Sequence, residues 1–257
     1  MSKGRRVLIV GVGGLGSPVA LALAESAAIA KLTLIDPDRV ELSNLHRQLL
    51  LRDGDLGMQK ASAAADTLRA RRPRARARAR GDGMELVPLA RKLSHENAAK
   101  LFREHDLIIE GSDDLHTKFL VNDYALALRV PAVIGGVVRF AGQVLTVWPG
   151  AACYRCLFEA PPEAGLAVSC QQAGVLGPAC GVVAGIMADE ALRIISGGGG
   201  GGDGDGGEGP RLAGTLLSLD LHSWQLRRVA IGRRSDCSAC FRAAATGENL
   251  DSAEARP

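Results

Sequence analysis

The sequence predicts an α/β fold: a mainly parallel sheet with crossover helices, continued by antiparallel strands, and a zinc-stapled C-terminal region. Three observations support this prediction. Short β-rich apolar runs alternate with longer helical patterns, a glycine-rich turn follows the first run, and two Cys-x-x-Cys pairs lie in the second half of the chain. Strands that alternate with helices are typical of parallel sheets. The 257 residues, 47% of them apolar, are enough to bury one large core.

The first strand is expected at residues 6–10, and the turn GVGGLG follows it directly. This turn matches the Rossmann-like pattern G-x-G-x-x-G through Gly11, Gly13 and Gly16. A hydroxyl that can cap a helix and a proline, which has no N–H to leave unpaired, come next as Ser17 and Pro18. We therefore expect the turn to open onto a helix N-terminus, where free N–H groups and the helix dipole favour a phosphate.

Strands and helices continue to alternate up to about residue 136. The β-rich runs predict further strands at 31–35, 74–79, 106–110 and 131–135. The longer periodic runs predict helices at 18–28, 59–71, 94–104 and 116–129. This alternation predicts βαβ units, whose strands are parallel.

The predicted strand at 74–79 belongs to an arginine-rich segment, with seven arginines between Arg69 and Arg80. Arginine and alanine alternate in this strand, which is the period of a half-buried strand with alanines inward and arginines in water. A nucleic-acid-binding patch is the alternative interpretation. Since no aromatic residue lies nearby to stack on bases, we expect no nucleic-acid partner.

The pattern changes after residue 136. The residues GQVLTVW at 142–148 predict an antiparallel strand, residues 178–196 predict a long buried helix, and two more strands are expected near 214–220 and 226–231. The glycine tract at 197–209 cannot bury enough apolar area to offset its chain entropy, so we expect a flexible connector there. The tail at 242–257 is also expected to be flexible.

Four of the six cysteines form two Cys-x-x-Cys pairs, which predict a structural zinc site with tetrahedral thiolate coordination by Cys153, Cys156, Cys237 and Cys240. A redox site or a set of unrelated reduced thiols is the alternative. Four thiolates leave no open position for a substrate, so the metal would organise structure only. Cys180 lies in an apolar helical run and is expected to pack. Cys170 lies in a polar loop and is either a candidate nucleophile or a spectator thiol.

Four charged residues point to a nucleotide. Asp36 follows the glycine turn at the distance where a ribose hydroxyl is bound, and the cations Arg47 and Lys60 come next. Asp113 follows the predicted strand at 106–110, and ligands of open α/β sheets bind outside such strand ends. Together these groups suit the transfer of a nucleotidyl group. Surface salt bridges are the alternative for any one of them. A dehydrogenase would need a second half that holds nicotinamide, and the residues after Asp36 do not resemble one.

At this point the sequence resembles a known family. The motifs GVGGLG, LTLIDPDRVELSNLHRQ, the lysine of GMQK, EGSDD, SCQQAGVLGP and the two Cys-x-x-Cys pairs are similar to those of the MoeB/ThiF family, over about residues 5–241. These bacterial enzymes activate sulfur-carrier proteins. The resemblance implies adenylation of the C-terminal Gly-Gly carboxylate of a small ubiquitin-like sulfur-carrier protein, with ATP, Mg²⁺ and Zn²⁺ as cofactors and a homodimer as the assembly.

The resemblance also implies a role for each site residue. Gly14 would lie against the phosphates and Asp36 on the ribose, and Arg47 and Lys60 would bind the triphosphate. Asp113 would hold Mg²⁺. The same pocket would include Gly11, Gly13, Asp38, Ser43, Asn44 and Asp114. Cys170 matches a cysteine that in some members accepts the activated carrier or takes part in sulfur transfer.

The resemblance further implies one adenylation domain over 1–241, with a nucleotide-binding half at 5–136 and a carrier-binding and zinc half at 137–241. The glycine tract would then be a cover for an entering Gly-Gly tail or, as we favour, a tolerated surface insertion.

Two departures from the family pattern bear on activity. Members carry an N-terminal helix whose arginine enters the ATP site of the partner subunit, and here we expect that arginine to be absent unless another chain supplies it. Asp114 replaces the usual asparagine, and its charge beside Asp113 is expected to raise a pKa or to alter metal affinity. The missing arginine leaves open a weak pseudo-enzyme or partner subunit that binds ATP or the carrier, and the arginine-rich strand leaves open an enzyme that adenylates a tRNA-bound carboxylate. A dehydrogenase ranks last.

The N-terminal residues show no apolar signal region, and no stretch reaches eighteen uncharged apolar residues. We therefore expect a cytoplasmic protein with no membrane span.

Overall fold

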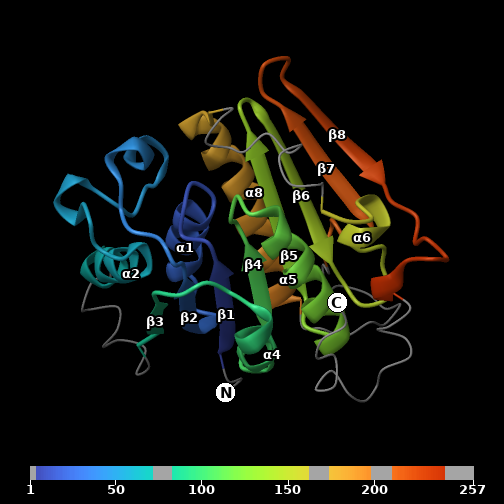
Figure 1. The fold of residues 1–257 in the computed structure, drawn as a ribbon, viewed down its shortest axis with the longest axis horizontal. Coiled ribbons are helices and arrows are strands. Elements are labelled where there is room, and N and C mark those ends of the chain that lie inside the picture. Colours follow the sequence, from blue (N-terminus) through green and yellow to red (C-terminus); the bar gives the residue numbers. More distant parts are fainter. Residues whose placement is uncertain (1–3, 72–82, 162–173, 198–209, 241–257) are drawn as a thin grey trace.

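The computed structural model describes residues 4–71, 83–161, 174–197 and 210–240. Eight strands form one sheet in the order β3-β2-β1-β4-β5-β6-β7-β8 (Figure 1). The strands are β1 (Arg5–Val10), β2 (Ile29–Ile35), β3 (Glu85–Leu89), β4 (Leu107–Glu110), β5 (Ala132–Val138), β6 (Ala141–Val147), β7 (Thr215–Asp220) and β8 (Gln225–Ala230). β1 to β5 pair in parallel, and β5 to β8 pair antiparallel. The predicted fold class is therefore confirmed.

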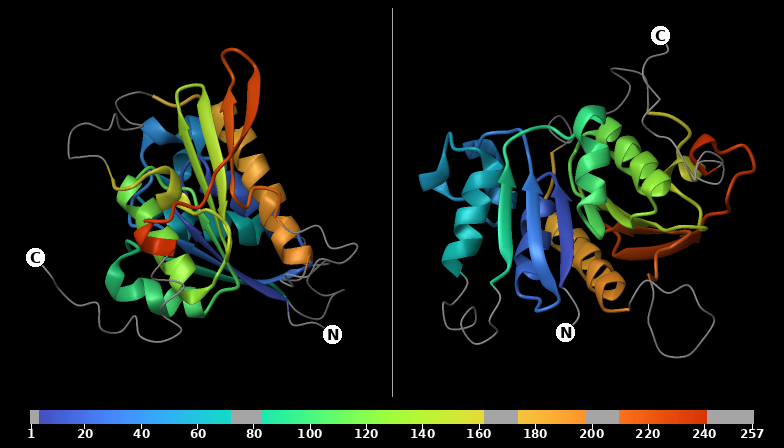
Figure 2. Two further views of the ribbon diagram at one scale, coloured as in Figure 1. Left: turned by 90° about the vertical axis from the view of Figure 1, so that its right-hand side faces the viewer. Right: turned by 90° about the horizontal axis from the view of Figure 1, so that it is seen from below.

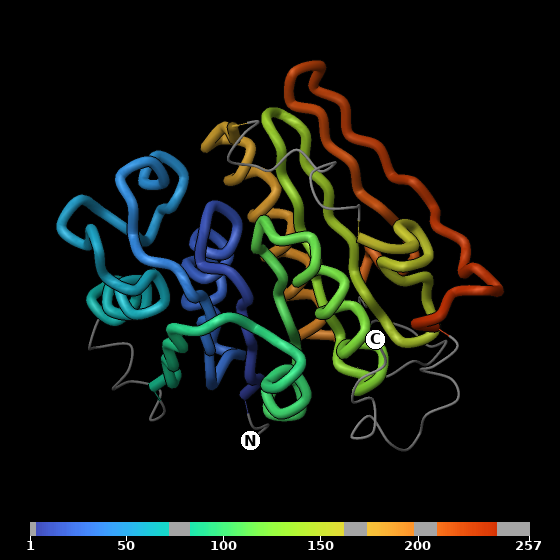
Figure 3. Tube along the Cα trace, viewed as in Figure 1, coloured from blue at the N-terminus to red at the C-terminus, as the bar shows by residue number. Residues whose placement is uncertain are grey.

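Helices cover both faces of the sheet (Figure 2). The longer ones are α1 (Gly16–Ala24), α2 (Lys60–Arg71), α4 (His95–Arg103), α5 (Leu115–Leu128) and α8 (Gly177–Ser196). α6 (Tyr154–Leu157) is short, and the 3₁₀ turns η1 (Leu42–Arg47) and η2 (Asp53–Asp55) lie between β2 and α2, in the excursion at the upper left of Figure 3.

The core is divided by the sheet into two apolar layers. Val7 and Ile9 of β1 pack into the layer that includes α1, α2 and α8, whereas Leu8 and Val10 pack into the layer of α4, α5 and α6. Alternate residues of a strand point to opposite faces, so a strand covered on both sides must be apolar throughout. This explains the continuous apolar run that precedes the glycine turn.

The first helix differs from the prediction at its start. α1 begins at Gly16, two residues earlier than predicted, so Ser17 lies inside its first turn and does not cap it. The hydroxyl of Ser17 instead donates to the carbonyl oxygen of Val12, at 2.8 Å. The early start is possible because residue 16 is glycine: a Cβ there would lie only 1.8 Å from the carbonyl oxygen of Gly11.

The strand at the β3 edge was missed by the sequence analysis. The predicted arginine strand at 74–79 lies outside the described residues, and β3 is formed by Glu85–Leu89 beside β2. The strand contains Pro88, and an edge strand tolerates proline because one row of its N–H groups has no partner strand. The glycine tract after residue 197, Cys170 and the tail at 242–257 also lie outside the described residues.

In the part of the chain that is described, no helix has the length and apolar composition needed to cross a membrane.

Candidate active site and metal centre

A cavity of about 960 Å³ opens at the carboxyl ends of β1, β2, β4 and β5, and we call it the strand-end cavity. Ligands of open α/β sheets bind outside these strand ends. Segments that are far apart in the sequence form its wall. The sequence-predicted residues that line it are Gly11, Gly13, Gly14, Asp36, Asp38, Asn44, Arg47, Lys60, Asp113 and Asp114. Ser43 is described but is not among the lining residues.

Asp36 anchors the glycine turn to the end of β2. Its Oδ2 accepts a hydrogen bond from the backbone N–H of Val12 at 2.7 Å, and its Oδ1 accepts one from the N–H of Asp38 at 2.8 Å. Burial raises the pKa of Asp36, and the two backbone hydrogen bonds act against this shift. The carboxylate therefore fixes the turn in the absence of any ligand, and its predicted contact with a ribose stays a prediction.

Two glycines of this turn are required by close approaches. Gly11 has φ +81°, in the left-handed region that side chains disfavour. A Cβ on Gly14 would lie 2.9 Å from Sγ of Cys180 and 3.4 Å from Cδ of Arg47. A residue with a side chain at position 14 would therefore crowd the predicted phosphate-binding surface.

Gly14→Ala is expected to lower the free energy of unfolding by about 1–3 kcal/mol, because its new methyl group meets the Cys180 sulfur in a packed region. Cys180→Ala removes that sulfur, so the double variant should be more stable than the sum of the two single effects predicts. Thermal or urea unfolding of the four proteins measures this coupling. Additive losses would contradict the contact between these two positions.

Arg47 is held at the cavity wall by neutral groups. Its guanidinium donates to Oδ1 of Asn44 at 2.6 Å and to the carbonyl oxygen of Ser43 at 3.4 Å. Both partners belong to η1, whose tight turn brings the side chains of residues 44 and 47 together. No carboxylate among the described residues pairs with this guanidinium, so its positive charge is available to an anion in the cavity.

Lys60 is the first residue of α2, and it lines the cavity. Its Nζ lies 2.8 Å from Oδ2 of Asp38, and its side chain is only 8% exposed, whereas that of Asp38 is 63% exposed. The backbone N–H of Lys60 also donates to the carbonyl oxygen of Asp38, at 2.9 Å. Asp38 thus fixes the position of the buried ammonium group.

Asp113 and Asp114 follow β4 and have different surroundings. Asp113 is exposed, lines the cavity, and has no hydrogen-bond or ion-pair partner among the residues that the structure describes. Asp114 caps α5 through the backbone N–H of His116, at 2.9 Å, and its Oδ2 pairs with Nζ of Lys92, also at 2.9 Å.

The expected rise of a pKa at this acidic pair is not found for Asp114. Burial acts to raise the pKa of Asp114, but the hydrogen bonds from Lys92, Thr117 and the N–H of His116 outweigh it and hold that pKa below its usual value. The extra charge of Asp114 is therefore compensated by a cation that the sequence analysis did not single out.

A buried ion pair at the cavity, between Lys118 and Glu110, was also missed by the sequence analysis. The ammonium of Lys118 contacts the carboxylate of Glu110 and donates to the carbonyl oxygens of Ser112, at 2.8 Å, and Gly135, at 2.6 Å. All three of its donors are therefore used. Glu110 is fully buried, which raises its pKa, although Lys118 and Ser112 oppose this. The pair ties the loop that carries Asp113 to β5. The sequence did contain one signal for this pair: Glu110, the first residue of EGSDD, is a charged residue at the end of an apolar strand.

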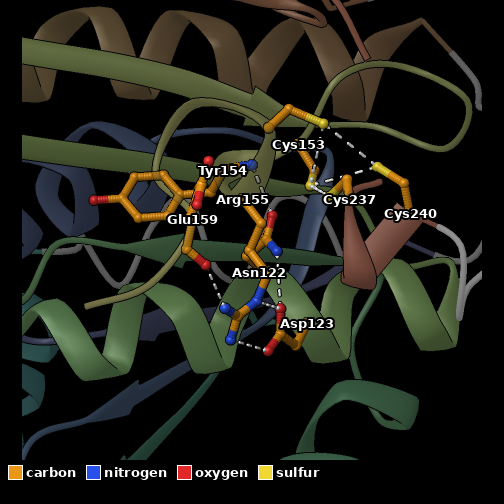
Figure 4. Close-up of polar contacts among 9 residues, drawn as sticks. Asn122, Asp123, Cys153, Tyr154, Arg155, Glu159, Cys237 and Cys240 are labelled. Atoms are coloured by element: carbon orange, nitrogen blue, oxygen red, sulfur yellow. Dashed lines mark hydrogen bonds and ion pairs between the residues drawn. The ribbon is translucent and has the colours of Figure 1, made fainter. Parts of the chain in front are cut away.

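The four predicted metal ligands come together where α6 meets the segment that follows β8. The Sγ–Sγ distances are 3.9 Å for Cys153–Cys156, 3.7 Å for Cys153–Cys237, 3.6 Å for Cys156–Cys240 and 3.5 Å for Cys153–Cys240 (Figure 4). All the ligand atoms lie within 4.8 Å of one another, and all four residues are buried. A tetrahedron with Zn–S bonds of about 2.3 Å has S–S edges of about 3.8 Å. The cluster therefore fits zinc.

Polar contacts fasten this metal centre to α5. Arg155, inside the first Cys-x-x-Cys pair, forms two hydrogen bonds with the carboxylate of Asp123, at 2.7 and 2.8 Å (Figure 4). The N–H of Tyr154 donates to Oδ1 of Asn122, at 2.8 Å. Tyr154 also lines the strand-end cavity. The metal centre therefore positions one wall residue of that cavity. Cys170, the candidate nucleophile, is not among the described residues.

Comparison with known proteins identifies the family. The sequence pattern described as ThiF family matches residues 2–239. The sulfur carrier protein adenylyltransferase of Thermus thermophilus is 37% identical over 244 residues, which cover 93% of this chain and 83% of that protein. The adenylyltransferase and sulfurtransferase MOCS3 of Xenopus laevis is 38% identical over 237 residues, which cover 91% of this chain. This chain spans about half of MOCS3, with 48% of its length covered.

Solved structures confirm the fold. The crystal structure of E. coli MccB with ATP matches 93% of this chain and 68% of that chain with a TM-score of 0.73. At 21% identity, this similarity concerns the fold alone. The predicted family and the predicted enzyme class are both confirmed. The chain therefore belongs to the ThiF family and is an adenylyltransferase.

Proposed function

We propose that this protein uses ATP to adenylate the C-terminal Gly-Gly carboxylate of a small ubiquitin-like sulfur-carrier protein and releases pyrophosphate. The observation that carries the proposal is the charge arrangement of the strand-end cavity. Arg47 has no carboxylate partner among the described residues, and among the carboxylates of the cavity wall Asp113 alone has no hydrogen-bond or ion-pair partner there. An uncompensated cation and an uncompensated carboxylate facing one cavity suit a magnesium-bound triphosphate.

The reaction needs positioning and charge neutralisation more than a protein acid or base. A carboxylate oxygen of the carrier attacks the α-phosphorus of ATP, the bond from that phosphorus to the bridging oxygen breaks, and pyrophosphate leaves with the electron pair. Arg47 and Lys60 bind the triphosphate and stabilise the charge that moves onto pyrophosphate. The N–H groups of the glycine turn and of the α1 N-terminus face the phosphates.

The two metals have separate places in this proposal. Mg²⁺, when bound at Asp113, supplies charge neutralisation for the leaving pyrophosphate. Zn²⁺, when bound by the four cysteines, supplies structure, because a site closed by four thiolates has no position for a substrate. The nucleotide-binding roles of Asp36, Asp38, Ser43, Asn44 and Asp114, the homodimer and the cytoplasmic location are parts of the same proposal.

The relatives support the choice of substrate. The Thermus thermophilus relative, which this chain covers for 83% of its length, is named a sulfur carrier protein adenylyltransferase. The MOCS3 relative is named an adenylyltransferase and sulfurtransferase, and this chain covers 48% of it. Adenylation of a carrier is therefore the activity that the matched part of both relatives favours.

ATP–pyrophosphate exchange tests the proposal. The purified chain is incubated with ATP, Mg²⁺, labelled pyrophosphate and a ubiquitin-like carrier, and the control is the same carrier without its two terminal glycines. We expect exchange only with the intact carrier, because only its terminal carboxylate reaches the α-phosphorus. Absence of exchange with every intact candidate carrier at saturation would reject the proposal. Exchange with an uncharged or charged tRNA instead would favour the tRNA-bound carboxylate.

Cys170→Ala separates adenylation from the step that follows it. We propose that the Cys170 thiolate attacks the carbonyl carbon of the adenylated carrier and forms a thioester as AMP leaves. In the alternative, Cys170 first accepts a sulfane sulfur from a persulfide donor, whose own thiol is released, and the Cys170 persulfide then attacks the same carbon and forms an acyl disulfide as AMP leaves. The variant should keep ATP–pyrophosphate exchange and lose the covalent species, which intact-protein mass spectrometry detects. A variant that still forms the covalent species would show that Cys170 is a spectator thiol.

A further inference from the structure

The strand-end cavity contains an ion pair between Lys92 and Asp114, and the proposed reaction assigns Lys92 no role. Lys92 lies between β3 and α4, and Asp114 precedes α5, so the pair joins two loops from separate parts of the sheet. Nζ of Lys92 lies 2.9 Å from Oδ2 of Asp114, and both residues line the cavity. The pair therefore faces whatever ligand the cavity holds.

Further contacts fix the position of the Asp114 carboxylate. Its Oδ1 accepts from the N–H of His116 at 2.9 Å, and its Oδ2 accepts from the hydroxyl of Thr117 at 3.0 Å. The carboxylate therefore cannot turn away from the cavity without uncapping α5. Lys92 is the cation that pairs with it.

The neighbouring residue explains why this neutralisation matters. Asp113 is adjacent in sequence, exposed to the same cavity and without a recorded partner in the described part of the chain. Two uncompensated carboxylates there would repel a triphosphate more strongly than one, and the repulsion acts at short range in a partly enclosed site. With Lys92 paired to Asp114, Asp113 is the one carboxylate of this loop whose charge is left for a metal ion.

We propose that Lys92 is a positioning residue for the nucleotide: it neutralises Asp114 and so keeps Asp113 as the single uncompensated carboxylate of the loop after β4. This inference rests on the proposed use of ATP. It assigns Lys92 no contact with the reacting atoms.

A purely structural salt bridge would behave differently. The side chain of Lys92 is 66% exposed, and exposed ion pairs contribute little to stability. Loss of Lys92 should therefore leave the melting temperature close to that of the wild type. Its effect should be seen in ATP binding, and it should depend on whether residue 114 carries a charge.

A charge-removal cycle tests the inference. The variants are Lys92→Ala, Asp114→Asn and the double variant; asparagine caps a helix as well as aspartate does, so α5 is kept. Lys100→Ala is the matched control, because Lys100 is an exposed lysine of α4 that does not line the cavity. Calorimetry measures the Kd for ATP with Mg²⁺, thermal unfolding measures Tm, and exchange kinetics separate KM from kcat.

Lys92→Ala is expected to raise the Kd and the KM for ATP about 5- to 10-fold, with Tm and kcat nearly unchanged. The double variant should bind ATP within about 2-fold of Asp114→Asn, since no charge is left to neutralise. Lys100→Ala should bind ATP as the wild type does.

Three results would count against the inference or the function beneath it. Unchanged ATP binding by Lys92→Ala would overturn the role of Lys92. A double variant as weak as Lys92→Ala would also overturn it, because Lys92 would then act on the nucleotide without Asp114. A wild-type protein that binds no ATP would overturn the proposed function itself. If the wild type binds ATP and Lys92→Ala binds it equally well, only the role of Lys92 is overturned.

Discussion

Arg47→Ala is expected to lower kcat/KM for ATP–pyrophosphate exchange by about 100- to 1,000-fold, the effect of removing one preorganised donor to transition-state charge. The guanidinium of Arg47 lines the strand-end cavity and pairs with no carboxylate among the described residues, so its charge is available to the triphosphate. Exchange kinetics at varied ATP concentration measure the loss. A fall in kcat would show that the contact strengthens in the transition state.

Two variants make this prediction specific. Arg47→Lys keeps the charge but loses the planar fork of donors, so it should have intermediate activity. Arg103→Ala removes an exposed arginine from α4, outside the cavity, and should leave exchange unchanged. If Arg47→Ala kept more than about a third of the wild-type kcat/KM while folding normally, Arg47 would not bind the reacting phosphates.

Cys237→Ser is expected to abolish stoichiometric zinc binding and to lower Tm by about 10 °C or more. Structural zinc sites supply apparent binding free energies of about 10–16 kcal/mol, and losing even ~3 kcal/mol corresponds to roughly 10 °C in a chain of this size. Cys237 follows β8 and lies 3.7 Å, between Sγ atoms, from Cys153, which precedes α6. The metal would therefore join the end of the described chain to the segment that carries α6.

Metal analysis of the purified protein and thermal unfolding measure these two effects. Cys180→Ala is the matched control, because Cys180 is also buried but lies on α8, outside the metal cluster. It should keep one equivalent of zinc. A wild-type protein isolated without zinc, or a Cys237→Ser variant that binds one equivalent as tightly as the wild type, would contradict the structural zinc site.

Much of the fold could be predicted from the sequence because its strongest signals are physical constraints. Residues 7–10 of β1 are covered on both faces, so they had to be apolar, and the glycine turn had to follow them where backbones approach closely. The long helix α8 was also predicted from its apolar pattern, at 178–196, and it is found at Gly177–Ser196. The four metal ligands could be predicted because two Cys-x-x-Cys pairs in one chain are typical of a zinc site.

The features that the sequence did not reveal depend on contacts between distant segments. β3 contains Pro88, which is tolerated only because the strand lies at the edge of the sheet. In the sequence Lys118 is one lysine of a predicted helix, and only the fold shows that it pairs with Glu110. Likewise, only the fold shows that Lys92 pairs with Asp114. The start of α1 depends on the close approach of Gly16 to Gly11, and rules for helix capping do not take such an approach into account.

A crystal structure of the chain with a non-hydrolysable ATP analogue and Mg²⁺ would test the central claim most directly. We expect the triphosphate to lie across the glycine turn at residues 11–16, with Arg47 and Lys60 bonded to its oxygens and Asp113 reaching it through the metal ion. A nucleotide bound with its phosphates directed away from these three side chains would contradict the account, even if ATP bound tightly.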